Sequence, residues 1–285
     1  MKLDTYVAAR FVRGDGAELV ADGSDWLLTA IDGADAPGYE LFSQDNGSGD
    51  GATVTGKRVK SRDLQLDATT LSVRRNPELR EQVTAFFNPM YEYKVYLTYM
   101  GRTRWLAAEL TGFKAPNDRV NVPQTFTAAF LAVKPYWQSV DDFGQDIAAI
   151  TPRWGFPYMD HPDYGVLVDI ANFERSVNFI YDGDAPAYPV ITLTADDRVT
   201  NPKIINGSAC VRLIDELAAG DVVELSTRPP RIEKNGQNVL NRVDRTSSFD
   251  GLAMQPGTNV YRYEADYGDN SLHVVIRYNK QYLGV

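Results

Sequence analysis

The side chains that most often carry enzymatic or metal chemistry are few in this 285-residue sequence, and they are widely spaced. The chain contains two histidines, His161 and His273, and one cysteine, Cys210, so these residues lack the spacing of a zinc site. No G-x-S-x-G serine accompanies them, which leaves nucleophilic catalysis without a sequence motif. We therefore expect no catalytic residues, no metal and no cofactor, and interpret Cys210 as an inert thiol in a strand.

Carboxylates are abundant, and a glycosidase needs only two of them placed across a sugar. Adjacent pairs occur at residues 141–142, 196–197 and 215–216, although adjacent acids are usually exposed loop residues. A cluster of aromatic residues favours sugar binding, because stacked rings form sugar platforms on β-sandwiches. The same rings could instead pin a long connection onto a domain, so the candidate peripheral glycan or partner surface stays open; it comprises Trp154, Phe156, Tyr158 and Tyr164.

The elements that would position these groups are mainly strands, with one helix in the first half of the chain. Asn76 is a suitable N-cap, Pro77 suits the first helical position, and Asn88-Pro89 ends the run, so the sequence predicts a helix over residues 77–87. Its apolar residues recur at i, i+4, i+7 and i+8 and predict one buried stripe. That stripe is formed by Leu79, Val83, Phe86 and Phe87.

The residues after this helix change to a period of two. Alternating side chains over residues 91–99 predict a half-buried strand, Met100-Gly101-Arg102 predicts a turn, and residues 103–113 return as a second strand. Residues 5–73 read as further short strands separated by turn formers. We expect a β-barrel-like first domain with one α-helix packed on it, extending over residues 1–138.

The segment 44–51, with the sequence QDNGSGDG, consists of polar turn formers and predicts a flexible hairpin tip. It lacks the alternating acidic ligands of a calcium loop, and it lacks the GK[ST] residues of a phosphate loop. Because such a tip is exposed, we treat its polar residues as a candidate contact between subunits: Asp45, Asn46 and Asp50.

The second half of the chain, residues 139–285, predicts a separate all-β domain. Asn206-Gly207 and Asn235-Gly236 each lie between apolar runs and provide the positive φ of a tight hairpin turn. Further strand patterns follow at short spacing up to residue 278. These signals together predict a β-sandwich of eight or more strands.

The formal net charge of −9 is unevenly distributed along the sequence. Residues 1–50 carry a net charge of −7, residues 51–140 carry +6, and residues 141–285 carry −8. The chain lacks a concentrated basic field with aromatic residues, so we expect no specific nucleic-acid binding. The acidic and basic segments are either ordinary solvated faces or complementary surfaces that meet between copies of the chain. Neither a signal peptide nor an apolar run of membrane-spanning length is evident.

A succession of short motifs runs through the chain. The first half contains Arg75-Asn76-Pro77, Phe86-Phe87-Asn88-Pro89, Tyr99-Met100-Gly101-Arg102 and, at its end, Pro135-Tyr136-Trp137. This order resembles the N-terminal domain of siphophage distal tail proteins. The second half is similar to the galectin-like C-terminal domain of the same family through residues 183–189, Asn201-Pro202, Gly220-Asp221, Pro256-Gly257-Thr258-Asn259 and Tyr282-Leu283-Gly284-Val285.

The resemblance implies a structural virion protein of a phage or prophage tail. Such a protein forms a homo-oligomeric ring, expected to be a hexamer, that joins the tail tube protein to tail-tip, baseplate or receptor-binding proteins. It is made in the host cytoplasm, leaves a channel for DNA and requires no catalysis. We expect acidic or neutral side chains in that channel, because basic ones would bind phosphate. The alternative is a carbohydrate-binding or glycan-cleaving β-sandwich protein.

Overall fold

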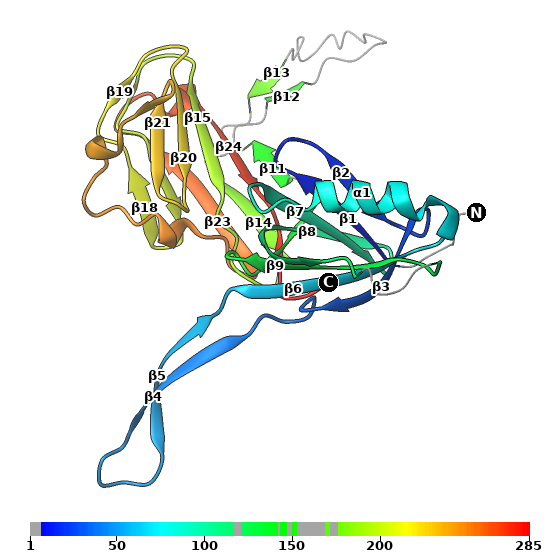
Figure 1. The fold of residues 1–285 in the computed structure, drawn as a ribbon. Coiled ribbons are helices and arrows are strands. Elements are labelled where there is room, and N and C mark those ends of the chain that lie inside the picture. Colours follow the sequence, from blue (N-terminus) through cyan, green and yellow to red (C-terminus); the bar gives the residue numbers. More distant parts are fainter. Residues whose placement is uncertain (1–6, 117–120, 142, 147–149, 153–168, 172–175) are drawn as a thin grey trace, which may run out of the picture. The chain divides into compact units, whose positions relative to one another are not determined.

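The computed structural model describes residues 7–116, 121–141, 143–146, 150–152, 169–171 and 176–285. The chain divides into two compact units (Figure 1). Unit 1 comprises residues 1–140 together with 281–285, and unit 2 comprises residues 141–280. Strands dominate both units, and the described residues contain one α-helix. The mainly β fold class is therefore confirmed.

Unit 1 is built on a nine-stranded sheet. Its main path runs in the order β2-β1-β7-β8-β9-β6-β3, and all its neighbouring strands are antiparallel. Within the described residues, the end strands β2 and β3 are not hydrogen-bonded to each other, so the sheet is open and does not close into a barrel. The strands are β1 (Val7–Arg13), β2 (Glu18–Ala21), β3 (Trp26–Asp32), β6 (Arg62–Thr70), β7 (Glu92–Tyr99), β8 (Arg102–Lys114), β9 (Thr125–Ala132), β10 (Trp137–Ser139) and β25 (Gln281–Tyr282).

The core of unit 1 follows the alternation of its strands. In β6, for example, Leu64 and Leu66 are buried while Asp63 and Gln65 face solvent. Phe87 lies at the centre of the aromatic packing, with ring centroids 5.1 to 5.4 Å from those of its nearest neighbours. These neighbours are Phe11, Phe86, Phe113 and Phe126.

The helix α1 (Asn76–Phe86) follows a 3-10 turn, η1 (Val73–Arg75), and packs on the inner face of this sheet (Figure 1). Leu79, Val83 and Phe86 are buried in it. Asn76 does not cap the helix, contrary to the sequence-based expectation, since it lies inside the first turn and the N-cap position is Arg75. The Asn76 amide instead accepts a hydrogen bond from Thr70 and donates one to the carbonyl of Val122.

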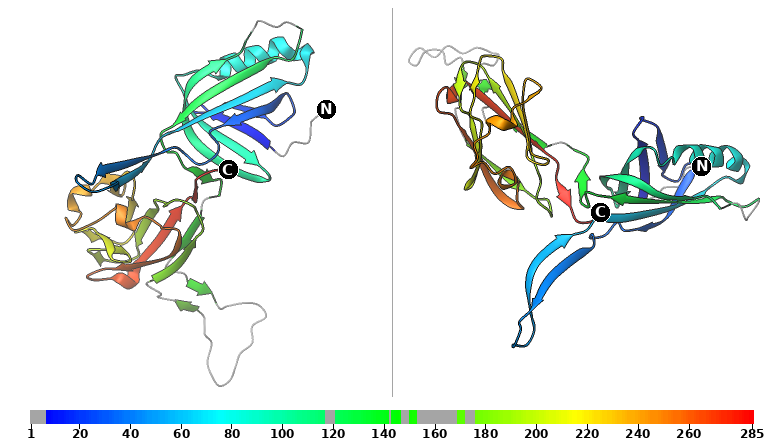
Figure 2. Two further views of the ribbon diagram at one scale, coloured as in Figure 1. Left: turned by 90° about the horizontal axis from the view of Figure 1, so that it is seen from below. Right: turned by 60° about the vertical axis from the view of Figure 1, so that its left-hand side comes forward.

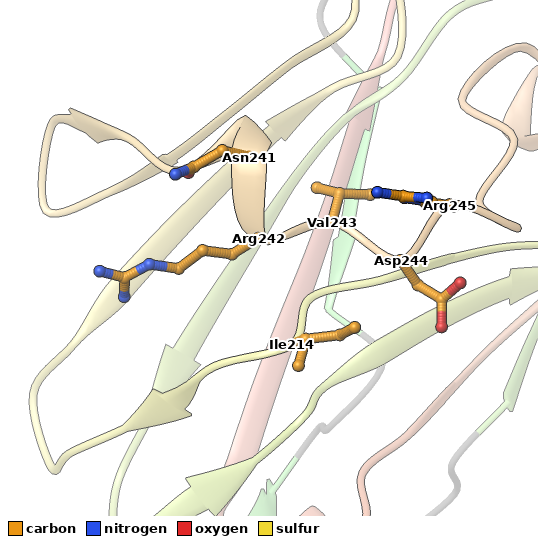
Figure 3. Close-up of a pocket in the computed structure, with 6 residues that line it drawn as sticks. All are labelled: Ile214, Asn241, Arg242, Val243, Asp244 and Arg245. Carbon is orange, nitrogen blue, oxygen red and sulfur yellow. The ribbon is translucent and has the colours of Figure 1, made fainter.

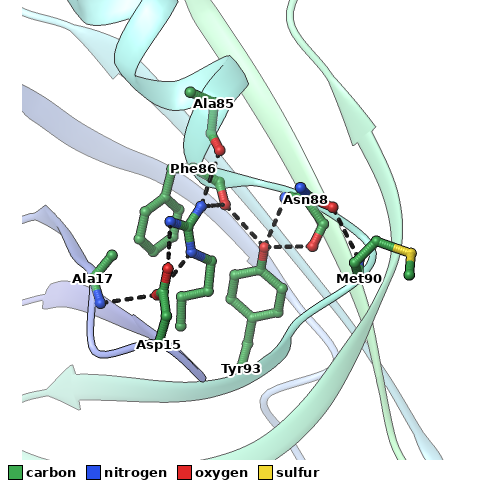
Figure 4. A network of polar contacts seen from close by, with 8 residues as sticks. Asp15, Ala17, Ala85, Phe86, Asn88, Met90 and Tyr93 are labelled. Carbon is green, nitrogen blue, oxygen red and sulfur yellow. Dashed lines mark hydrogen bonds and ion pairs between the residues drawn. The ribbon is translucent and has the colours of Figure 1, made fainter.

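The C-terminal end of α1 is held by side chains from neighbouring strands (Figure 4). Arg13 donates 3.0 Å hydrogen bonds to the carbonyls of Ala85 and Phe86, and the Tyr93 hydroxyl donates to Phe86. A bidentate contact with Asp15 fixes the guanidinium, and the hydrogen bond from Arg13 lowers the pKa of Asp15. Burial raises the pKa of Tyr93. Carbonyls that lack a partner within the helix are thereby satisfied.

A long hairpin projects from unit 1 between β3 and β6 (Figures 1 and 2). It consists of β4 (Tyr39–Asp45) and β5 (Ala52–Val59), which pair only with each other in a two-stranded antiparallel sheet. We call residues 39–59 the arm. Its turn, residues 46–51, falls inside the stretch from which the sequence predicted a hairpin tip.

Unit 2 is a β-sandwich, as predicted. A six-stranded sheet in the order β11-β24-β15-β20-β21-β22 and a four-stranded sheet in the order β14-β23-β17-β18 enclose one apolar core. Asn235 and Gly236 supply φ values of 50° and 77° to the turn between β21 and β22.

The remaining elements of unit 2 are mostly short. β12 (Ile150–Pro152) and β13 (Asp169–Ala171) form a small two-stranded sheet of their own. The other strands and 3-10 turns are β11 (Phe143–Asp146), β14 (Ser176–Tyr181), β15 (Val190–Ala195), β16 (Val199–Thr200), β17 (Lys203–Asn206), β18 (Ala209–Arg212), β19 (Glu216–Leu217), β20 (Val222–Ser226), β21 (Arg231–Lys234), β22 (Gln237–Asn238), β23 (Gly257–Glu264), β24 (Leu272–Tyr278), η2 (Leu240–Arg242), η3 (Asp250–Leu252) and η4 (Asp269–Ser271).

Candidate functional site

The residues able to do chemistry are dispersed over unit 2. His273 lies on β24, where its Nε2 is 2.5 Å from a carboxylate oxygen of Asp196, and Cys210 is half-buried on β18. Within the part of the chain that the structure describes, no three His, Cys, Asp or Glu side chains come close enough to hold a metal ion. His161 lies outside that part. His273 and Cys210 are therefore ordinary residues of the sheets and do not form a common site.

The acidic pair Asp215 and Glu216 is divided between different cations. Asp215 accepts a 2.6 Å hydrogen bond from Arg242, whereas Glu216 accepts one of 2.6 Å from Arg198. Asp215 and Asp221 also lie 3.8 and 3.0 Å from the Lys234 ammonium. The two adjacent carboxylates therefore take part in surface ion pairs, and they do not face each other across a sugar-sized gap.

A shallow pocket of about 460 Å³ opens beside η2 in unit 2 (Figure 3). Arg242 extends away from Arg245 and its guanidinium pairs with Asp215, so the two arginines do not converge on one ligand. The carboxylate of Asp244 accepts hydrogen bonds from Thr246, which hold its pKa below the usual range. The lining carries no aromatic ring and no pair of carboxylates; it consists of Ile214, Asn241, Arg242, Val243, Asp244 and Arg245.

The candidate glycan or partner surface predicted from four aromatic residues falls outside the part of the chain that the structure describes. Trp154, Phe156, Tyr158 and Tyr164 belong to residues 153–168, which lie outside the described residues. In the chain they fall between β12 and β13. The glycan or partner surface at these four residues stays a prediction.

The candidate contact residues at the tip of the arm have different roles. Asn46 organises the turn, because its amide donates to the carbonyl of Asp50 at 3.2 Å and accepts the Thr53 hydroxyl at 2.7 Å. The Asn46 backbone N–H also donates to Gly51. Asp45 and Asp50 are exposed. Their carboxylates are therefore the groups at this tip that can meet another molecule.

The arm has one apolar face that nothing in the described residues covers. Val59 is paired with Tyr39, and strand alternation places Leu41 on the same side. Val54 joins them through its pairing with Ser43 after a register shift, and Lys57, the partner of Leu41, lies on this side too. The exposed fractions of these side chains are 71% for Tyr39, 51% for Leu41, 53% for Val54 and 37% for Val59. The alternating apolar residues of this stretch were visible in the sequence, which predicted strands there and gave no sign of where they would be buried.

The opposite face of the arm carries charged side chains together with the exposed ring of Phe42. Arg58 forms a 2.8 Å ion pair with Glu40, and its guanidinium lies 5.9 Å from the ring centroid of Phe42. The arm is thus a two-stranded ribbon with most of its exposed apolar side chains on the Tyr39 face and with Phe42 on the other. Isolated two-stranded hairpins are marginally stable in water, and exposed apolar patches on a soluble fold usually mark interaction sites. The apolar face of the arm is therefore the best candidate for a functional site among the described residues.

Comparison with known proteins agrees with this organisation. Residues 182–282 match the family model described as siphovirus-type tail component, C-terminal domain. The crystal structure of the Dit protein of phage SPP1 has the same fold: the TM-score is 0.67 at 14% identity, over 96% of this chain and 99% of that chain. That protein is described as a paradigm of the hub adsorption apparatus in phages infecting Gram-positive bacteria. No curated protein matches the sequence.

A second solved structure, the baseplate of phage p2 in its activated conformation with strontium, has a TM-score of 0.50 at 8% identity, over 96% of this chain and 98% of that chain. The family match assigns residues 182–282 to the C-terminal domain of siphovirus-type tail components, and the chain as a whole has the fold of the SPP1 Dit protein. The resemblance of the chain to siphophage distal tail proteins is therefore confirmed.

No helix among the described residues combines the length and the apolar character that crossing a membrane requires.

Proposed function

We propose that this protein assembles into a ring, expected to be a hexamer, at the junction between the phage tail tube and the tail tip or baseplate. The observation that carries the proposal is the arm, whose apolar face remains exposed in the single chain. A contact between two different surfaces of identical subunits generates a ring when its rotation closes. The arm provides one of those two surfaces.

The tip of the arm supports the same assignment. Asp45 and Asp50 are exposed there, and Asn46 fixes the turn that presents them. We propose that these residues contact the neighbouring subunit. Covering the apolar face would add the main favourable free energy, at roughly 25 cal/mol for each Å² of apolar surface buried.

The outward side of β6 and β9 in the sheet of unit 1 has the character expected of a channel for DNA. The solvent-facing side chains of β6 include two carboxylates and no basic residue, and those of β9 are neutral. We propose that this face lines the channel, because carboxylates repel phosphate and short neutral side chains offer it no strong contact. On β6 the residues are Asp63, Gln65, Asp67 and Thr69, and on β9 they are Thr125, Thr127, Ala129 and Leu131.

The remaining parts of the proposal concern partners and chemistry. The tail tube protein would bind one side of the ring and tail-tip proteins the other. Unit 2 would face outward and bind baseplate or receptor-binding proteins, with the aromatic residues Trp154, Phe156, Tyr158 and Tyr164 as a possible glycan or partner surface. The protein would act in the virion without catalysing a reaction, after synthesis in the host cytoplasm.

Mass photometry and negative-stain electron microscopy of the purified protein test this function. We expect one ring-shaped species with the mass of a closed oligomer, and a glycan array that stays blank. A monomer across micromolar concentrations that binds sugars would overturn the proposal and favour the carbohydrate-binding alternative.

A further inference from the structure

Residues 281–285 belong to unit 1, although they follow unit 2 in the chain. We call these five residues the latch. Gln281 and Tyr282 form β25, which pairs with β10, and Tyr282 also packs against the core of unit 1 from its surface. None of the five residues is buried, and Leu283 is exposed. A segment with so few buried contacts can detach by local opening while the core stays folded.

Two arginines bind the latch through its backbone. Arg62 donates a 2.6 Å hydrogen bond to the carbonyl of Leu283, and Arg104 donates to the carbonyl of Gly284. The Arg104 guanidinium also lies 3.6 Å from the centre of the Tyr282 ring, as a cation–π contact. Unit 1 therefore contains a binding site for an extended peptide, which it recognises by two backbone carbonyls and one aromatic ring.

The latch also packs on the root of the arm, residues 33–38. A Cβ atom at Gly284 would lie 3.4 Å from the carbonyl oxygen of Ala34 and 3.5 Å from the Cα atom of Asp35. The backbone of the latch is therefore in direct contact with these two residues of the root. The two residues are themselves only partly covered, since Ala34 is half-buried and Asp35 is exposed.

Buried residues of unit 1 bind the same part of the root. Trp137 is fully buried and donates a 3.1 Å hydrogen bond from its ring nitrogen to the carbonyl of Ala34. Arg62, which is 3% exposed, donates to the carbonyls of both Asp35 and Leu283, so one guanidinium binds the root and the latch together. Loss of the latch would leave these buried donors in place and would remove the packing of Gly284 on the root.

We propose that residues 281–285 form a releasable latch on the arm. When the latch is docked it holds the root, and when it detaches the root becomes mobile while the cores of both units stay folded. Only Asn279 and Lys280 lie between the latch and β24, and Lys280 is anchored in unit 2 by a 2.6 Å ion pair with Asp182. This short connection gives unit 2 a covalent route to the arm. The inference concerns a single chain and does not depend on the proposed ring.

A substitution at Gly284 tests the latch in the full chain. Gly284→Ile should displace the latch, because its side chain extends beyond a Cβ that already touches the root, whereas Gly284→Ala is the matched control whose Cβ fits at ordinary contact distance. Limited digestion with a protease that cleaves before aspartate measures the opening, because the cleavage rate follows the open population. In Gly284→Ile, cleavage between Ala34 and Asp35 should accelerate ~10-fold or more, the effect of about 1.4 kcal/mol on the opening equilibrium. Cleavage before Asp50, at the exposed tip of the arm, is the internal control and should keep its wild-type rate.

A chain that lacks residues 281–285 provides the second measurement. Cleavage before Asp35 should be fast in it, and a synthetic peptide of residues 280–285, KQYLGV, should slow that cleavage again. The same peptide with Tyr282→Ala should fail, because it lacks the ring that faces Arg104.

Wild-type cleavage before Asp35 in both Gly284→Ile and the shortened chain would overturn the latch. Equal acceleration before Asp35 and Asp50 in Gly284→Ile, or loss of its folded circular dichroism spectrum, would overturn it as well, because unit 1 would then unfold as a whole. The absence of a ring in the wild-type protein would contradict the proposed function and leave these expectations unchanged.

Discussion

The guanidinium of Arg62 donates a 2.6 Å hydrogen bond to the backbone carbonyl of Leu283, although 221 residues separate them in the sequence. Arg62 is only 3% exposed, and it also donates to the carbonyls of Gly33, Asp35 and Pro135. Burial lowers the pKa of Arg62 to about 10, so it remains protonated at neutral pH. One buried cation thereby ties the root of the arm to the C-terminal residues of the chain.

We predict that Arg62→Met destabilises unit 1 by about 3 kcal/mol or more, because several buried carbonyls lose their donor at once. Urea unfolding measures the change. Arg102→Met, on the exposed start of β8, is the control and should stay within about 0.5 kcal/mol of the wild type. Equal effects of the two substitutions would contradict a structural role for the buried guanidinium.

Deleting residues 281–285 should also destabilise unit 1, because it removes the Leu283 carbonyl that Arg62 binds. The same segment contacts Arg104, whose guanidinium donates to the Gly284 carbonyl and lies 3.6 Å from the centre of the Tyr282 ring. The deletion and Arg62→Met should not add, because they remove the same hydrogen bond. Strict additivity in a double-mutant cycle would show that the two sites act independently.

The core of α1 gives a second prediction. Phe86 is 6% exposed, and its ring lies 5.1 Å from that of Phe87 and 5.9 Å from that of Tyr93. Phe86→Ala should cost about 3 to 5 kcal/mol through lost burial and the cavity that remains. Glu81→Ala, on the exposed side of the same helix, should change the unfolding free energy little. A melting temperature unchanged by Phe86→Ala would place the buried face of the helix elsewhere.

The sequence predicts α1 well because its evidence is local. Four apolar residues at helical spacing give both the element and its buried side, and the expected bounds differ from the observed ones by one residue at each end. The role of Asn76 is missed because its amide bonds to Thr70, in the preceding strand, and to Val122, which lies 46 residues away in the sequence. A capping motif considers only neighbouring residues, whereas in the folded chain the same side chain can form hydrogen bonds with other segments.

The contacts of the arm and of the C-terminal segment could not be predicted from the sequence for a different reason. Alternation at Tyr39 and Leu41 predicts a strand with one buried face, but it does not say whether the burying surface belongs to the same chain. Likewise, no pattern in residues 281–285 indicates a partner at Arg62, 221 residues away. Contacts of long sequence separation need the folded chain before they can be found.

Gly33 gives a third prediction, at the root of the arm. Its φ is +80°, and a Cβ atom there would lie 1.9 Å from the backbone carbonyl oxygen of Asp63. Gly16 has a similar φ of +89° but open space around it. Gly33→Ala should therefore destabilise unit 1 far more than Gly16→Ala, whose cost is limited to about 1 kcal/mol of backbone strain. Thermal unfolding followed by circular dichroism compares them, and similar melting temperatures would rule out the close approach at Gly33.

Unit 2 should show acid sensitivity that depends on Asp221. The backbone N–H of Ala218, with Asn235 and Lys234, lowers the pKa of Asp221 to about 2. A carboxyl group with a depressed folded-state pKa stabilises the fold above its unfolded-state value and loses that contribution as the pH falls toward the folded-state value. Asp221→Asn should therefore be less stable than the wild type at neutral pH, and the difference should shrink as the pH falls from about 4 toward 2. Asp250→Asn is the exposed control, and a difference that persists at low pH would contradict this origin.

The proposed channel face makes a final prediction that combines fold and function. Asp63 and Asp67 are outward residues of β6 on either side of Gln65, so Asp63→Lys/Asp67→Lys replaces two negative charges per subunit with positive ones without touching the core. Rings of the variant should retain double-stranded DNA at low salt and release it as salt rises, because each neutralised phosphate frees counterions. Wild-type rings should retain none. Glu78→Lys/Glu81→Lys, a reversal of the same size on the exposed side of α1, is the matched control for non-specific attraction. Equal DNA retention by the two variants would show that the β6 face does not line the channel.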